Sequence, residues 1–375
     1  MKRPKIPLLT VGLIAAFLGA CSAGGGSGGD AEHAFLYVPN QVSNDISAYS
    51  VDVTSGVLTA VSGSPFAAGA GAMSIAAVPT GKFVYIAYSD DGTIGGFSVN
   101  ASTGALTPVK GSPFPAAPSI SSLVVALSGD HLFTANHYSE SLYAYAIDPT
   151  TGALSRAASY ALLHETPADV AVTPSGRFVY APDHFTAVHG FAFDASAGRL
   201  TLVPGSPYTT GGVYPSGGVI DPEGRFFYTT HMYSARIDGF AIDPASGSLS
   251  PIAGSPFPMR DIEGSFRLTI DRQGRFVYAS NCNHPCISIF SRDTVTGALT
   301  EIPGSPFRRT IEPYVYPSAV AIHPSGRFAY ASSYFENNVH SFSIDPVSGM
   351  LTEIAGSPRP AGDHPVDLAI VRFVR

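Results

Sequence analysis

The chain has 375 residues, with 21 Lys and Arg against 28 Asp and Glu, and a net charge of −7 at pH 7. Nucleic acid is therefore excluded as an expected partner, because phosphate binding needs a concentrated basic surface. The length would ordinarily predict more than one domain, but internal repeats change that expectation and are considered first.

The first twenty residues have the order of a secretory signal. Lys2, Arg3 and Lys5 form a basic segment, and residues 6–18 form an apolar stretch too short for a permanent membrane span. The following Leu-Gly-Ala-Cys, ending at Cys21, resembles the lipobox of bacterial lipoproteins, which implies that Cys21 becomes the lipidated first residue. The alternative is ordinary cleavage with loss of Cys21. We predict a signal peptide over residues 1–20.

Residues 21–32 are Gly/Ser-rich and suit a flexible tether between a membrane and a folded domain. By resemblance to Gram-negative lipoproteins, the absence of Asp after the Cys implies outer-membrane anchoring, with the domain periplasmic or surface-facing. Removing the signal leaves 18 basic and 28 acidic residues, a net charge of −10. We expect a monomer that contacts the membrane through its lipid only.

The two remaining cysteines, Cys282 and Cys286, lie in the segment CNHPC. A disulfide between them is the expected state in an oxidising compartment. A metal site using both thiols and His284 is the alternative, although structural zinc needs four ligands and no second cluster is evident.

Residues 33–375 are repetitive. A turn glycine recurs seven times, in steps of 46 to 52 residues, at Gly56, Gly104, Gly152, Gly198, Gly247, Gly297 and Gly349. Each unit predicts four short strands separated by Pro- and Gly-containing turns, with no helical periodicity of useful length. Four strands repeated about every 48 residues are typical of propeller blades. The fold class predicted is all-β, a seven-bladed β-propeller.

The two ends of the repeat region complement each other. The first unit lacks its innermost strand, whereas the C-terminal PVDLAIVRFV matches the innermost strands of the other units. We therefore expect the C-terminal strand to complete the first blade, which would remove an open sheet edge.

A Gly-Ser-Pro segment recurs six times, as in GSPF ending at Phe307. Six equivalent serines around a ring cannot all be nucleophiles, and the segment lacks the G-x-S-x-G pattern of a nucleophile elbow. Pro cannot donate a ladder hydrogen bond, so we expect it to end strand pairing after the outermost strand, with Phe packing between neighbouring sheets.

The PSGRFVYASN-like strand pairs, the IDPxTGxLT turns and the GSPF links together resemble the seven-bladed lactonase-like propellers, which include 6-phosphogluconolactonases and muconate cycloisomerase relatives, and the related YVTN-type repeats. This resemblance implies a lactonase site with Pro-Arg-His at an inner strand and Asn-Glu after the second strand. Neither motif is present. The matching inner positions read Pro167-Ala168-Asp169, Pro215-Ser216-Gly217, Ser265-Phe266-Arg267 and Pro317-Ser318-Ala319.

The candidate catalytic residues lie at the entrances of the inner strands. Asp169, Arg267 and Asp367 occupy equivalent positions in alternate blades, so the arginine is expected between two carboxylates at the channel mouth. Arg267 could bind a carboxylate or sugar acid, with an Asp or a nearby His moving a proton. A structural ion-pair network is the alternative.

The candidate ligand-binding residues lie in the connections at the same end of the blades. Three histidines, His137, His184 and His231, have matched or nearly matched positions in consecutive blades. They could form a metal site, but no known motif places carboxylates beside them, and we expect no metal there. His164 and Glu165 stand where the third unit replaces the GSPF link. Variable polar loops on a rigid scaffold commonly bind ligands, although solvation alone produces the same distribution.

We call the end of the propeller that carries these connections and the inner-strand entrances the top face. The sequence thus predicts an envelope propeller that binds a small acidic or sugar-like molecule, or an envelope protein, at its top face. The alternative is a lactone hydrolase with a non-standard site. No cofactor is expected.

Overall fold

The computed structural model describes residues 32–162, 166–260, 264–281, 285–308 and 317–373. Residues 1–31, His164, Glu165, Cys282 and His284 lie outside this part, so the predictions made for them stay predictions. The described residues contain strands and turns and no helix, and hence no helix of a length and apolarity that would cross a bilayer.

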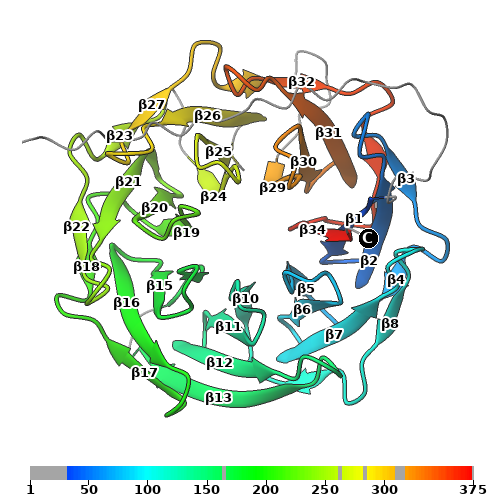
Figure 1. Cartoon of the computed structure of the whole chain (residues 1–375), viewed down its shortest axis with the longest axis horizontal. Helices are drawn as coiled ribbons and strands as arrows, with labels where there is room; N and C mark the ends of the chain where they lie inside the picture. Colours follow the sequence, from blue (N-terminus) through cyan, green and yellow to red (C-terminus); the bar gives the residue numbers. More distant parts are fainter. Residues whose placement is uncertain (1–31, 163–165, 261–263, 282–284, 309–316, 374–375) are drawn as a thin grey trace, which may run out of the picture. The chain divides into compact units, whose positions relative to one another are not determined.

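Seven antiparallel sheets surround a central axis (Figure 1), which makes this unit a seven-bladed β-propeller. The blades are numbered here from the one containing β1. The innermost strands are β34 (Ala369–Phe373), β5 (Ala72–Ala77), β10 (Ile120–Val125), β14 (Ala171–Val172), β19 (Pro215–Ile220), β24 (Ser265–Ile270) and β29 (Pro317–Ile322). The second strands are β1 (His33–Asn40), β6 (Phe83–Tyr88), β11 (His131–Asn136), β15 (Phe178–Pro182), β20 (Phe226–His231), β25 (Phe276–Asn281) and β30 (Phe328–Ser333).

The outer half of each blade follows the same order. The third strands are β2 (Asp45–Val51), β7 (Thr93–Val99), β12 (Ser141–Ile147), β16 (Ala187–Asp194), β21 (Ser234–Ile242), β26 (Cys286–Arg292) and β31 (Asn338–Ile344). The fourth are β3 (Leu58–Ala60), β8 (Leu106–Pro108), β13 (Leu154–Ala161), β17 (Arg199–Leu202), β22 (Leu249–Pro251), β27 (Leu299–Glu301) and β32 (Leu351–Glu353). A short fifth strand occurs in six blades as β4 (Phe66–Ala67), β9 (Phe114–Pro115), β18 (Tyr208–Thr209), β23 (Phe257–Pro258), β28 (Phe307–Arg308) and β33 (Arg359–Pro360).

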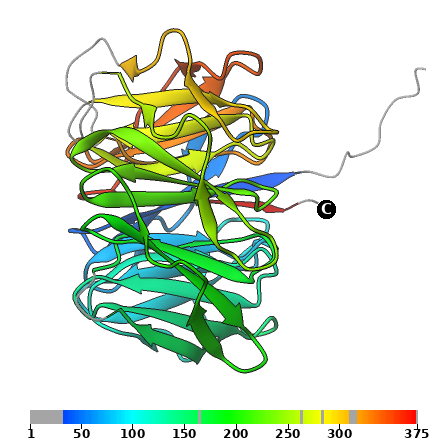
Figure 2. The ribbon, with the colours of Figure 1, turned by 90° about the vertical axis from the view of Figure 1, so that its left-hand side faces the viewer.

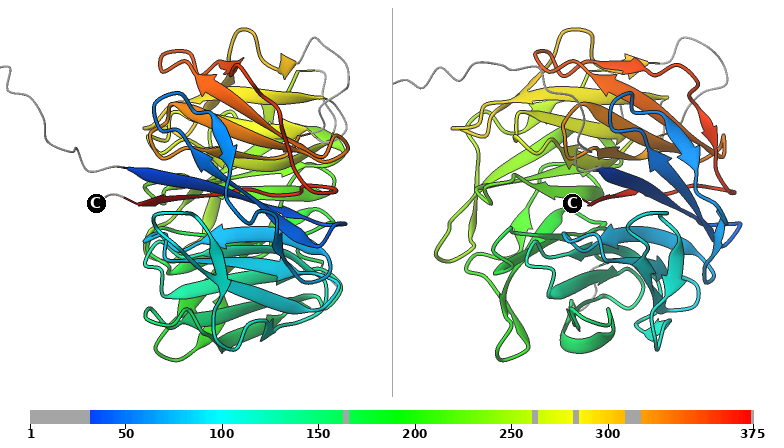
Figure 3. Two further views of the ribbon diagram at one scale, coloured as in Figure 1. Left: turned by 90° about the vertical axis from the view of Figure 1, so that its right-hand side faces the viewer. Right: turned by 45° about the vertical axis from the view of Figure 1, so that its right-hand side comes forward.

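The C-terminal strand completes the first blade, as the sequence predicts. β34 pairs with β1 in antiparallel register from His33↔Phe373 to Tyr37↔Ala369. The side views show the two strands lying together across the ring (Figures 2 and 3). The first and last strands of the repeat region therefore share one sheet, and β1 is paired on both of its edges.

The hydrophobic core lies between neighbouring blades. The described residues form seven buried clusters, each combining side chains from two adjacent sheets. At the closing junction, Leu36 and Val38 of blade 1 belong to the same cluster as Tyr330 and Val339 of blade 7. Each blade thus buries its faces only against its two neighbours, so stability requires a complete ring.

A second contact repeats across these junctions. A tyrosine of the second strand donates its hydroxyl to the turn glycine carbonyl of the next blade, for example Tyr37 to Gly104 at 2.7 Å and Tyr330 to Gly56 at 3.0 Å. Gly104 has a φ of 73°, and an added Cβ would lie 2.3 Å from the Phe35 ring. The glycine is therefore needed for both its backbone conformation and its contact.

The prediction that Pro ends strand pairing in the GSPF links is wrong. The outer strand does not end there, because pairing to the third strand resumes at the residue after Pro, as in Phe66↔Ile46. The interruption is bridged by the serine, since Ser64 Oγ accepts a hydrogen bond from the Ala48 N–H at 2.8 Å and the other five serines do the same. Blade 3, which lacks the segment, has the uninterrupted strand β13.

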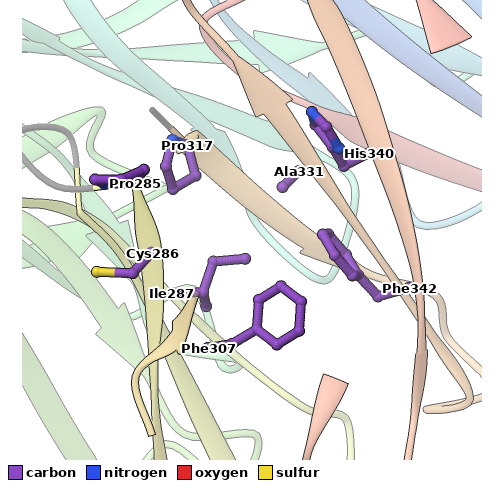
Figure 4. A pocket seen from close by; sticks show the side chains of 8 residues that line it. All are labelled: Pro285, Cys286, Ile287, Phe307, Pro317, Ala331, His340 and Phe342. Atoms are coloured by element: carbon purple, nitrogen blue, oxygen red, sulfur yellow. The ribbon is translucent and has the colours of Figure 1, made fainter. Parts of the chain in front are cut away.

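The aromatic residue of the link packs between blades, as predicted. At the junction of blades 6 and 7, the Phe307 ring meets Phe342 edge to face with centroids 5.3 Å apart. Figure 4 shows the two rings beside a small apolar cavity, with the Cys286 sulfur directed away from them. Gly-Ser-Pro-Phe is therefore an architectural element, with its serine and its ring in separate structural roles.

Deleting residues 367–375 tests ring closure. Loss of β34 exposes the edge of β1 and the core between blades 7 and 1, so we expect aggregation or a fall in melting temperature of more than ~10 °C. Thermal melting followed by circular dichroism and light scattering measures both. A control lacking only residues 374–375 should melt like the parent, and a 367–375 deletion that did the same would contradict closure by β34.

Candidate functional site

The inner-strand entrances form a ring at the mouth of the channel. Arg267 lies on β24 of blade 6, Asp169 precedes β14 of blade 4, and Asp367 precedes β34 of blade 1. Arg267 Nη1 is 3.7 Å from Asp367 Oδ2 and 4.0 Å from Asp169 Oδ1. The structure therefore brings together the three residues that the sequence places at equivalent positions.

Each carboxylate also joins neighbouring blades. Asp367 Oδ2 accepts hydrogen bonds from Ser74 Oγ at 2.8 Å and from the Ile75 N–H at 3.1 Å, both in blade 2. Asp169 accepts from Ser122 Oγ of blade 3 at 2.5 Å and from the Gly218 N–H of blade 5 at 2.9 Å. These bonds fix both carboxylates on the ring and use their acceptor oxygens.

The guanidinium of Arg267 is less completely satisfied. Its distances to the two carboxylates are longer than hydrogen bonds, and its buried Nε has no partner among the described residues. Burial alone would lower the pKa of Arg267, but Asp367 and Asp169 outweigh it and raise that pKa above its ordinary value. Arg267 is thus a cation whose guanidinium N–H groups are only partly paired within the described residues.

A cavity of about 330 Å³ opens beside this ring. Asp169 and Arg267 form part of its wall, together with His137 and His184 from the top loops of blades 3 and 4. The volume is at the lower end of the range for small-molecule sites. The cavity combines one cation, one carboxylate and two imidazoles.

The two histidine rings meet edge to face, with ring centroids 4.5 Å apart. Burial and the neighbouring His137 lower the pKa of His184 to about 4, although Asp183 acts in the opposite direction. Burial also lowers the pKa of His137 from its usual value. Both imidazoles are therefore neutral at pH 7, and the buried His137 Nδ1 has no partner within the described part of the chain.

The third histidine of the predicted set lies elsewhere. His231 is fully buried at the end of β20, where its Nε2 is 2.5 Å from Asp238 Oδ2, and Gly212 packs over its ring. It does not line the cavity. Among the residues with described positions, no three His, Cys, Asp or Glu side chains gather as a metal site, so the structure brings His137 and His184 together without His231.

Cys286 is a buried residue at the start of β26, where burial raises the pKa of its thiol and Asn281 Nδ2 lies 3.5 Å from its sulfur. Its predicted disulfide partner Cys282 lies outside the described residues.

Several cavity residues were not predicted from the sequence. They are uncharged residues of the top loops and inner strands, namely Gln41, Met73, Ser89, Ser119, Ser121, Tyr138, Ala168, Ser216 and Phe266. Serines are common throughout this chain, so their residue type gives no signal. Tyr138 could have been predicted from the sequence, because it directly follows His137 in a top loop whose sequence differs from unit to unit.

Comparison with known proteins agrees with this architecture. A family model described as "Lactonase, 7-bladed beta-propeller" matches residues 29–120, 62–166, 111–207 and 163–261 in overlapping registers. The chain therefore belongs to the seven-bladed lactonase propeller family. A search of the curated proteins found no match.

Solved structures share the fold at low sequence identity. A Pseudomonas aeruginosa periplasmic gluconolactonase matches with a TM-score of 0.76 and 18% identity, over 92% of this chain and 100% of that one. A Bacteroides fragilis protein, provisionally described as a 6-phosphogluconolactonase, gives 0.75 and 21%, over 90% and 98%. A Kuenenia stuttgartiensis hydrazine synthase chain gives 0.61 and 14%, over 81% and 96%. At these identities the likeness establishes the fold alone.

The lowered pKa of His184 predicts a pH-dependent stability. In the unfolded chain its pKa returns to about 6.5, so acid protonates the unfolded state first and stability falls as pH drops from about 6.5 to about 4. We expect the loss of unfolding free energy over this pH range to be ~1 kcal/mol smaller in His184→Phe than in the parent, a value reduced to allow for partial solvent exposure. Urea unfolding at several pH values measures it, with His33→Phe as the control. Parallel curves for His184→Phe and the parent would refute this assignment.

Proposed function

We propose that the protein is a cell-envelope propeller that binds a small acidic, sugar-like molecule in the cavity at its channel mouth. The observation that carries this proposal is Arg267, a cation fixed beside two carboxylates that are already hydrogen-bonded, with its own donors incompletely used. A planar guanidinium suits a carboxylate ligand, because it can donate two parallel hydrogen bonds.

The rest of the cavity suits the remainder of such a molecule. Ser89, Ser119 and Ser121 bring hydroxyl groups to the wall, and Phe266 and Met73 bring apolar surface. The volume of about 330 Å³ is compatible with one sugar-sized ligand. The envelope location rests on the N-terminal segment, whose basic, apolar and Cys-containing parts are those of a lipoprotein signal.

Arg267 gives the direct test of binding. Isothermal titration calorimetry with D-glucuronate and, for comparison, neutral D-galactose should show binding of the acid only. Arg267→Gln should weaken glucuronate binding by ~10-fold or more, because the carboxylate loses its charged partner, and Arg267→Lys should weaken it less. Arg199→Gln, an exposed arginine at the opposite end of blade 4, is the matched control.

Thermal melting of each variant separates lost folding from lost binding. Equal glucuronate affinity in a folded Arg267→Gln protein would overturn the proposal, as would tight binding of galactose alone.

A second candidate function is lactone hydrolysis. It is favoured by the neutral histidine pair, since an unprotonated imidazole at pH 7 can act as a general base. Here an imidazole would take a proton from water as the water oxygen attacks the lactone carbonyl, and Arg267 would stabilise the resulting oxyanion. The ring C–O bond would then break, the leaving alkoxide would recover the proton, and a hydroxy acid would remain. Family membership and the gluconolactonase neighbour support this candidate.

The hydrolysis candidate predicts turnover of D-glucono-δ-lactone above its spontaneous rate, followed by pH-stat titration. His137→Gln and His184→Gln should each lower kcat by ~100-fold or more if that imidazole is the base. The rate should fall with acid as the imidazoles become protonated. A rate no greater than the spontaneous one, or one indifferent to both variants, would leave the binding function alone.

A further inference from the structure

Large exposed aromatic side chains gather on the top loops of blades 3 to 5. Tyr138 is 79% exposed, Tyr233 54% and Tyr214 40%. Aromatic rings of this size usually bury much of their surface in a folded protein. Their exposure on neighbouring loops points to a surface that receives a ligand.

These rings form a continuous series with the cavity histidines, which we call the aromatic arc: Tyr138, His137, His184, Tyr214 and Tyr233. Successive ring centroids lie 4.6, 4.5, 5.8 and 5.2 Å apart. The first three residues line the cavity, and the last two do not. The arc therefore begins inside the proposed binding site and continues outward to blade 5.

Tyr214 lies in a turn whose backbone is left-handed in several blades. It lies three residues before the mouth residue of its blade and has a φ of 57°, a left-handed conformation. The equivalent positions in blades 2 and 6 are Gly71 and Gly264, which adopt positive φ readily, whereas blades 3 and 1 have Ser119 with a φ of 60° and His364 with a φ of 57°. A bulky residue there costs on the order of 1–3 kcal/mol, a cost that a glycine would remove.

The loop that carries Tyr214 is fixed by its backbone. The Tyr214 N–H donates to the Phe185 carbonyl at 3.1 Å, and the Met232 N–H donates to the Tyr214 carbonyl at 2.8 Å. The ring is consequently held between His184 and Tyr233 before any ligand arrives, which lowers the entropic cost of binding.

The chemistry of the arc identifies its occupant. Tyrosine presents an apolar face and a hydroxyl, which match the apolar C–H faces and hydroxyl groups of a sugar ring. Arg236, three residues after Tyr233, is already paired with Asp238 at 2.5 Å, so the outer end of the arc is a poor site for a polyanionic chain. Continuity with a cavity for one acidic sugar favours further sugar units outside it.

We infer that the site takes an oligosaccharide ending in an acidic sugar, with the acidic unit at Arg267 and the following units on Tyr214 and Tyr233. This inference rests on the proposed function and extends it from a single sugar to a chain. It assigns the outer two tyrosines to recognition of the units that remain outside the cavity.

Calorimetry with D-glucuronic acid, an aldotriouronic acid that carries one terminal glucuronate on two neutral xylose units, and neutral maltotriose tests the inference on the purified protein. The acidic trimer should bind ~10-fold or more tightly than the monomer, because stacked rings add ~1 kcal/mol or more each. Tyr214→Ala and Tyr233→Ala should reduce that advantage to about twofold, and the Phe variants should retain most of it. Leu127→Ala, which removes an exposed side chain 61% accessible in the turn between β10 and β11, is the control.

Each contrary outcome has a distinct meaning. A trimer that binds no better than the monomer overturns the extended site and leaves the proposed function standing. Absence of binding by both acids overturns both. Tighter binding of maltotriose than of the acidic trimer overturns the acidic end. A dimer seen by sedimentation and abolished by Tyr214→Ala would show that the arc receives a second copy of the chain instead.

Discussion

The structure depends on burial between adjacent sheets. No blade has a core of its own, because each hydrophobic cluster among the described residues is shared by two neighbours. All seven hydrophobic clusters are buried only when the last sheet packs against the first, and β34 joins the two ends of the chain by pairing with β1. The tyrosine-to-glycine hydrogen bonds add a polar contact across six junctions and are missing between blades 3 and 4, where Phe133 replaces the tyrosine.

Ring closure also determines which charged side chains meet at the channel mouth. Because the inner strands converge on one axis, residues about 100 positions apart in sequence become neighbours at the mouth, as Asp169, Arg267 and Asp367 do. The hydrogen bonds of both carboxylates to adjacent blades make the mouth part of the scaffold. The same network that the ring needs for rigidity therefore presents Arg267 to the cavity, so the structural and ligand-binding interpretations of these residues are compatible.

The sequence predicted what the repeat encodes. The period, the turn glycines and the unmatched C-terminal strand were sufficient for seven closed blades, and alignment of the units located the mouth residues. It could not separate His137 and His184 from His231, because their surroundings depend on top loops that do not repeat. It also missed the resumed pairing after each Gly-Ser-Pro, since a serine hydroxyl that replaces a ladder acceptor leaves no periodic signal. The strained Tyr214 would have been found by comparing its position with Gly71 and Gly264.

The most direct measurement is an experimental structure of the protein with D-glucuronate bound. We predict seven sheets, Arg267 at the mouth between Asp169 and Asp367, and the ligand carboxylate within ~3 Å of the Arg267 guanidinium. A ligand bound away from the mouth, or an Arg267 side chain directed away from the cavity, would contradict the account.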